Sequence, residues 1–107
     1  MAIRNIFVVG AGLMGSGIAQ NAVTSGYNVT INDQRQEALD RARAGIEKAL
    51  NREVEKGRMT AEDRDAALAR LSIDATLESA KDADLVIEAI VEELAAHAGV
   101  PVFNGLT

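Results

Sequence analysis

Short apolar runs alternate along this chain with segments whose apolar residues recur at helical spacing. The runs are β-branched and bounded by turn residues, which is typical of buried strands. Pro101 favours an edge position for the last of them, because proline cannot donate to a sheet ladder. We expect five strands, at residues 3–9, 27–31, 71–74, 85–90 and 100–103.

The segments between these runs predict helices. Residues 36–56 give the longest one, with an apolar stripe formed by Leu39, Ala42, Ile46, Ala49, Leu50 and Val54. After Gly57, the sequence from Thr60 to Asp63 is typical of a capping box and opens a helix that runs to about Arg70. We expect further helical segments at residues 13–25, 77–81 and 91–98.

This alternation predicts an α/β fold with a parallel sheet and helices on both faces. The best candidate is a Rossmann-like doubly wound sheet of about five strands in the order 3-2-1-4-5. A helical hairpin follows its second strand. With 107 residues, the chain has the length of one domain, spanning residues 1–107.

Composition excludes several classes of protein. The sequence contains no cysteine, so disulfides and thiolate zinc sites are excluded, and we expect a cytoplasmic location. No apolar run is long enough to span a membrane. Arg4 and the apolar residues after it resemble a signal peptide, but the four glycines between residues 6 and 19 favour a strand-turn-helix unit.

The charge pattern argues against nucleic acid as a partner. The formal net charge is −5, and no basic stripe is present. Phe7, Tyr27 and Phe103 are the three aromatic residues, which leaves little for base stacking. One histidine and dispersed acids show no metal-ligand spacing, so we expect no metal site.

The strongest chemical signal is Gly10-Ala11-Gly12-Leu13-Met14-Gly15, which matches G-x-G-x-x-G between a predicted strand and a predicted helix. Glycine permits the tight turn at the first position, close approach of a pyrophosphate at the second, and close packing of the helix at the third. The free N–H groups near Leu13 and Met14 would then face the phosphates.

Asp33 ends the second predicted strand, where a carboxylate can accept hydrogen bonds from the adenosine ribose and repel a 2′-phosphate. This favours NAD over NADP, and we include the neighbouring Gln34 in the expected site. Arg35 leaves the preference open, since an arginine there could hold a 2′-phosphate or simply lie in solvent. The competing interpretation uses the glycines for packing only and makes Asp33 a turn residue.

Residues 6–20, IFVVGAGLMGSGIAQ, and residues 82–92, DADLVIEAIVE, resemble the NAD-dependent 3-hydroxyacyl-CoA dehydrogenases of fatty-acid β-oxidation. The resemblance covers about residues 2–92. It implies that residues 10–15 hold the pyrophosphate and that Asp33 holds the ribose. It also implies that Ala89 and Glu92 border the nicotinamide half of the cofactor, although Glu92 could equally complement a helix dipole.

The family's catalytic histidine and its glutamate lie well downstream in a longer chain, before a helical substrate and dimerisation domain. His97 does not match that histidine by position, and no acid stands at the spacing of an obvious orienting pair. Residues 93–107, ELAAHAGVPVFNGLT, are instead similar to a segment of ornithine-type carbamoyltransferases, which suggests a chimera. Glu88, near the end of a strand, could face a ligand or make a structural hydrogen bond.

We therefore expect a domain that binds NAD(H), has no catalytic residue of its own and does not turn over substrate. One alternative is a truncated or chimeric scaffold without appreciable affinity for ligands. Another is a dehydrogenase fragment that needs a partner domain. Exposed sheet could also drive self-association.

Overall fold

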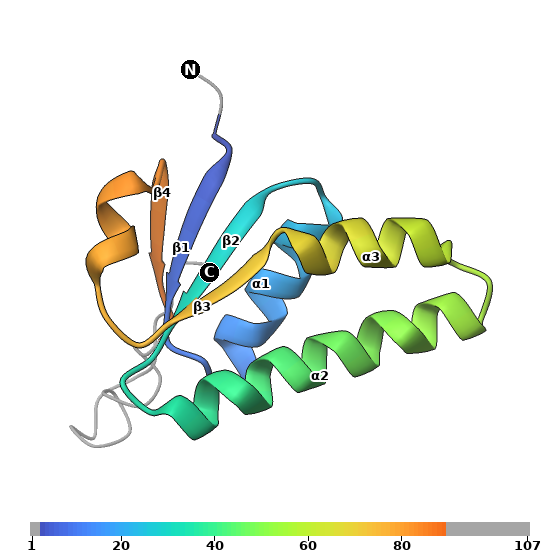
Figure 1. The fold of residues 1–107 in the computed structure, drawn as a ribbon, viewed down its shortest axis with the longest axis horizontal. Coiled ribbons are helices and arrows are strands. Elements are labelled where there is room, and N and C mark those ends of the chain that lie inside the picture. The colour runs from blue at the N-terminus through green and yellow to red at the C-terminus, as the bar shows by residue number, and fades with distance from the viewer. Residues whose placement is uncertain (1–2, 90–107) are drawn as a thin grey trace, which may run out of the picture.

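The computed structural model describes residues 3–89. Strands and helices alternate in chain order, as the sequence predicts (Figure 1). The elements are β1 Asn5–Val9, α1 Leu13–Thr24, β2 Asn28–Asn32, α2 Gln36–Glu55, α3 Ala61–Ala69, β3 Leu71–Asp74, the 3₁₀ helix η1 Glu78–Asp82 and β4 Leu85–Glu88.

The four described strands form one parallel sheet in the order β3-β2-β1-β4. This confirms the Rossmann-like order predicted for the first four strands. In the central pair, Phe7 of β1 lies opposite Thr30 of β2. The expected helix at 91–98 and the expected strand at 100–103 lie outside the described residues.

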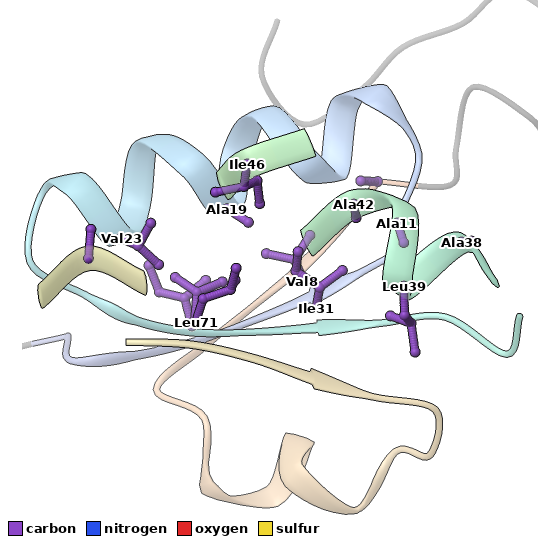
Figure 2. Packing of buried hydrophobic residues seen from close by; sticks show 14 of the residues in the cluster. Val8, Ala11, Ala19, Val23, Ile31, Ala38, Leu39, Ala42, Ile46 and Leu71 are labelled. Atoms are coloured by element: carbon purple, nitrogen blue, oxygen red, sulfur yellow. The ribbon is translucent and has the colours of Figure 1, made fainter. Parts of the chain in front are cut away.

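The hydrophobic core lies between the sheet and the three α-helices, which cover one face, while η1 lies on the other (Figure 2). Val8 and Ile31 point from the strands into this core. Four members of the predicted α2 stripe are buried, whereas Ala49 and Val54 are half-buried. The buried members are Leu39, Ala42, Ile46 and Leu50.

Strand β4 is more exposed than the sequence predicts. The run from residue 85 to 90 suggests a strand buried on both faces, but Leu85 is 38% and Val86 50% exposed. Within the described part of the chain, β4 pairs only with β1, so no described residue pairs with its other edge. An apolar run shows β-structure, but it does not show which neighbours cover that strand.

The α2–α3 hairpin is fixed at both ends of α3. At the start, the Thr60 hydroxyl accepts a hydrogen bond of 3.0 Å from the Asp63 N–H, which confirms the predicted cap. At the other end, the Arg70 guanidinium donates through Nε to the carbonyl of Val23 in α1, at 3.1 Å.

No helix among residues 3–89 is long and apolar enough to cross a bilayer.

Candidate functional site

The candidate site lies where the carboxyl ends of β1, β2 and β4 meet. Because these strands are parallel, the residues that follow them share one edge of the sheet. The Gly10 N–H donates to the Asn32 carbonyl at 2.7 Å, and the Ala89 N–H donates to the Val9 carbonyl at 2.8 Å. These bonds hold the first residue of the glycine loop and Ala89 against the strand ends.

The shape of the glycine loop requires glycine at two positions. Gly10 has φ +108°, a conformation that residues with a Cβ rarely adopt. A Cβ at Gly15 would lie 1.8 Å from the Gly10 carbonyl oxygen, so only glycine lets α1 pack this closely on the loop. The N-terminus of α1 is therefore held directly against the end of β1.

Gly12 is different, because the fold itself does not require glycine there. It has an extended conformation with φ −76°, and an added Cβ would meet no atom of the described residues within 4 Å. It is the N-cap of α1, and no side chain makes a capping hydrogen bond. A bare backbone in open space beside a helix N-terminus leaves room for a ligand to approach the helix N–H groups closely.

The first turn of α1 has the electrostatics of an anion site. The first N–H groups of a helix have no intrahelical acceptors, and the helix dipole makes this end electropositive. No acidic residue lies in this turn. Leu13 is 96% exposed, while Met14 is partly buried against the core. The sequence indicated this loop and this helix end, and the structure places them together.

Asp33 lies beside the loop, just beyond the end of β2. Its Oδ2 accepts a hydrogen bond of 3.1 Å from the Ala11 N–H, and its Oδ1 accepts one of 2.9 Å from the Arg35 N–H. The Arg35 side chain also donates to both carboxylate oxygens. The bonds from the Arg35 side chain contribute most to lowering the pKa of Asp33, and the backbone bonds add to this effect. The resulting pKa is about 2, although burial opposes the shift. Asp33 is therefore an ionised acceptor at neutral pH.

The sequence pattern does not single out two polar residues at this edge. Asn32 is buried, and its side-chain amide donates to the carbonyls of Asp74, at 2.9 Å, and of Thr76. It thereby joins the ends of β2 and β3. Asp74 accepts hydrogen bonds from Thr76 and Ser79, which lower its pKa to about 2. Position at a strand end was the available signal for both residues.

The remaining expected site residues divide between exposed, buried and undescribed positions. Gln34 is exposed next to Asp33, and Glu88 is exposed at the end of β4. Ala89 is buried at the same edge. Glu92 and His97 lie outside the described residues. From residue 3 to residue 89, no cluster of three potential ligands could hold a metal ion.

Comparison with known proteins identifies the family. The model of the 3-hydroxyacyl-CoA dehydrogenase NAD-binding domain matches residues 5–101. A probable 3-hydroxybutyryl-CoA dehydrogenase of Bacillus subtilis is 46% identical over 96 residues, which cover 90% of this chain and 33% of that protein. A 3-hydroxybutyryl-CoA dehydrogenase of Mycobacterium tuberculosis strain H37Rv is 39% identical over 99 residues, covering 92% of this chain and 35% of that protein.

Solved structures agree. The crystal structure of M. tuberculosis FadB2 has a TM-score of 0.83 and 39% identity, covering 92% of this chain and 35% of that one. Escherichia coli 3-hydroxybutyryl-CoA dehydrogenase has a TM-score of 0.81 and 36% identity, covering 92% of this chain and 22% of that one. This chain thus spans about a third of the length of the curated relatives it matches. It belongs to the family of NAD-binding domains of 3-hydroxyacyl-CoA dehydrogenases.

Proposed function

We propose that these 107 residues bind NAD(H) at the carboxyl edge of the sheet and do not, by themselves, oxidise a 3-hydroxyacyl-CoA. The observation that supports NAD(H) binding is that the uncapped, electropositive N-terminus of α1 lies beside the ionised carboxylate of Asp33, at the end of the neighbouring strand. Membership of an NAD-binding family supports it. When bound, NAD supplies the site that accepts or donates a hydride.

Each part of the site has a separate task in this proposal. The backbone of residues 10–15, with the N–H groups of Leu13 and Met14, holds the pyrophosphate. Asp33 accepts hydrogen bonds from the adenosine ribose, and Gln34 lies beside it. Ala89 and Glu92 border the nicotinamide half. The bare Gly12 backbone supports this arrangement, since no atom of residues 3–89 lies within 4 Å of the position that a Cβ would take.

The absence of turnover follows from what hydride transfer requires of a protein. A base must take the hydroxyl proton, and a pocket must orient the acyl chain. The sequence contains a single histidine, His97, which does not match the family's catalytic position. We therefore assign no catalytic residue within this chain.

Calorimetric titration of the 107-residue chain with NADH tests the binding half. We expect saturable binding that Asp33→Ala weakens at least tenfold, which corresponds to about 1.4 kcal/mol. Asp65→Ala serves as the matched control, because Asp65 lies exposed on α3 and pairs with Arg64. No heat at millimolar NADH would contradict the proposal and support the scaffold alternative.

An assay for acetoacetyl-CoA reduction by NADH tests the other half. We expect no rate above background from the chain alone, and measurable turnover would overturn this part of the proposal. A second candidate is a dehydrogenase fragment that becomes active with a partner domain, which the one-third coverage of its relatives favours. Adding a separately expressed helical domain of such a relative distinguishes the two, because only the second candidate gains activity.

We also propose a chimeric origin for residues 93–107, and we assign no chemical role to this segment. The family match extends to residue 101 and so overlaps this segment.

We also propose a cytoplasmic location, on the ground that the sequence has no cysteine. We further propose that the chain self-associates through the exposed apolar residues of β4. Comparing the sedimentation of Val86→Lys with that of the unchanged chain tests this.

A further inference from the structure

The Asp33 carboxylate already has four hydrogen-bond donors. Oδ1 accepts from the backbone N–H and from Nε of Arg35, at 2.9 and 3.1 Å. Oδ2 accepts from the Ala11 N–H and from Nη2 of Arg35, both at 3.1 Å. An ionised carboxylate offers about four lone-pair sites. A ribose diol can therefore bind to Asp33 only if some of these donors leave.

The four donors are not equally free to move. The Ala11 N–H belongs to the glycine loop, and the Arg35 N–H belongs to the N-cap residue of α2, whose carbonyl accepts from Ala38 and Leu39. The guanidinium is carried on a flexible side chain that is 56% exposed, whereas the Asp33 side chain is 9% exposed. The guanidinium is therefore the group that a ribose displaces, while the two backbone donors keep Asp33 in place.

The ion pair also changes what the site repels. An unpaired carboxylate disfavours a ribose 2′-phosphate by charge repulsion. Here the carboxylate is paired with a guanidinium, which presents planar donors suited to phosphate oxygens. Once displaced from Asp33, this guanidinium remains tethered two residues away, beside the place where the 2′ oxygen would bind.

We propose that Arg35 is a specificity-determining residue, which reduces the preference of this site for NAD over NADP by offering its guanidinium to a 2′-phosphate. The proposal rests on the proposed function, because it requires the dinucleotide to bind with its ribose at Asp33. The quantity that defines it is the ratio of the dissociation constant for NADP⁺ to that for NAD⁺. Removing the Arg35 charge raises this ratio.

The test is calorimetric titration of the full chain with NAD⁺ and with NADP⁺ at one fixed low ionic strength, since screening weakens the effect. We expect Arg35→Gln to raise the ratio at least fivefold, and Arg35→Lys, which keeps the charge but loses the planar donors, to raise it less than Arg35→Gln does. Arg58→Gln is the matched control. Arg58 pairs with Glu53 within the α2–α3 hairpin, and its removal leaves the ratio unchanged.

A rise of less than fivefold for Arg35→Gln, or an equal rise for Arg58→Gln, overturns the proposal while leaving NAD binding intact. If the unchanged chain binds neither dinucleotide at millimolar concentration, the proposed function fails and this inference fails with it. Urea unfolding of Arg35→Gln checks that the variant is folded, so an altered ratio cannot come from loss of structure.

Discussion

Gly12, Gly15 and Gly17 lie within two turns of each other, yet the structure gives each a different status. At Gly15, a Cβ would overlap the Gly10 carbonyl, so packing requires glycine. At Gly12, the backbone conformation is ordinary and an added Cβ would meet no described atom within 4 Å, so packing among the described residues does not require glycine. Nothing in the structure explains Gly17, where a Cβ would also meet no atom within 4 Å among residues 3–89.

We expect Gly15→Ala and Gly17→Ala to change the stability in opposite directions. Gly15→Ala forces α1 away from the loop and lowers the free energy of unfolding by about 3 kcal/mol, the upper end of typical overpacking costs. Gly17→Ala raises it by roughly 0.5–1 kcal/mol, because alanine restricts the unfolded chain more than glycine does. Urea unfolding measures both variants, and equal losses would contradict this account of the loop.

The sequence predicts the position of Asp33 but not its hydrogen bonds. A carboxylate after the second strand follows from spacing, because a parallel strand brings its end to the same edge as the glycine loop. The bidentate bonds from Arg35 depend on side-chain rotamers that no local pattern encodes. The role of Asn32 depends on the carbonyls of Asp74 and Thr76, more than forty residues away along the chain.

The N-terminus of helix α1 lacks two features that commonly stabilise the start of a helix. Its N-cap contributes no side-chain hydrogen bond, and its first turn holds no acid. By contrast, α3 begins with the Thr60 cap and has Glu62 and Asp63 in its first turn. An N-terminus left without these stabilising features is the place where an anion gains most from the helix dipole.

Leu13→Glu should therefore separate stability from binding. Leu13 is almost fully exposed, so the substitution removes little packing. A carboxylate in the first turn stabilises the ligand-free helix by about 0.3–1 kcal/mol, yet it repels the pyrophosphate. We expect NADH affinity to fall at least tenfold against the uncharged control Leu13→Gln. Equal affinities of the two variants would show that phosphate binds elsewhere.

The long elements were predictable because their patterns are local. The α2 stripe and the Thr60 cap each lie within a few helical turns of sequence. The exposure of β4 was not predictable, since an apolar run in a strand does not reveal whether a second strand or a helix covers it. Tertiary neighbours, rather than strand propensity, set the burial of such a strand.

Two carboxylates connect segments that are distant along the chain, and a third holds a local turn. Asp84 accepts hydrogen bonds of 2.9 Å from the N–H groups of Arg4 and Asn5, which joins the start of β4 to the start of β1 and lowers the pKa of Asp84. Asp33 joins the glycine loop to α2, and Asp74 holds the turn before η1. Their carboxylate oxygens therefore help to hold these segments in place.

Stability should fall in acid through these carboxylates. An aspartate whose pKa is lowered on folding contributes stability that is complete above its unfolded pKa near 4. This contribution is lost as the pH falls toward about 2, the folded pKa of Asp33 and Asp74. We expect Asp33→Asn to reduce this acid-dependent loss by about 1 kcal/mol after allowance for solvent screening.

The measurement is urea unfolding between pH 7 and pH 2.5. Asp65→Asn is the control, because Asp65 is 69% exposed on α3. Its curve should run parallel to that of the unchanged chain, whereas the Asp33→Asn curve should be flatter. Parallel curves for all three proteins would show that Asp33 has the same pKa in the folded and unfolded chains.

The uncapped start of α1 also allows a bound phosphate to be detected by amide hydrogen exchange. The amide protons of Leu13 and Met14 have no acceptor within the helix, so they should exchange with deuterium rapidly in the free protein. The Gly10 amide, bonded to Asn32 at 2.7 Å, should exchange slowly throughout. Slower exchange at residues 13 and 14 with an unchanged rate at residue 10 would therefore locate a bound phosphate to a single turn of helix.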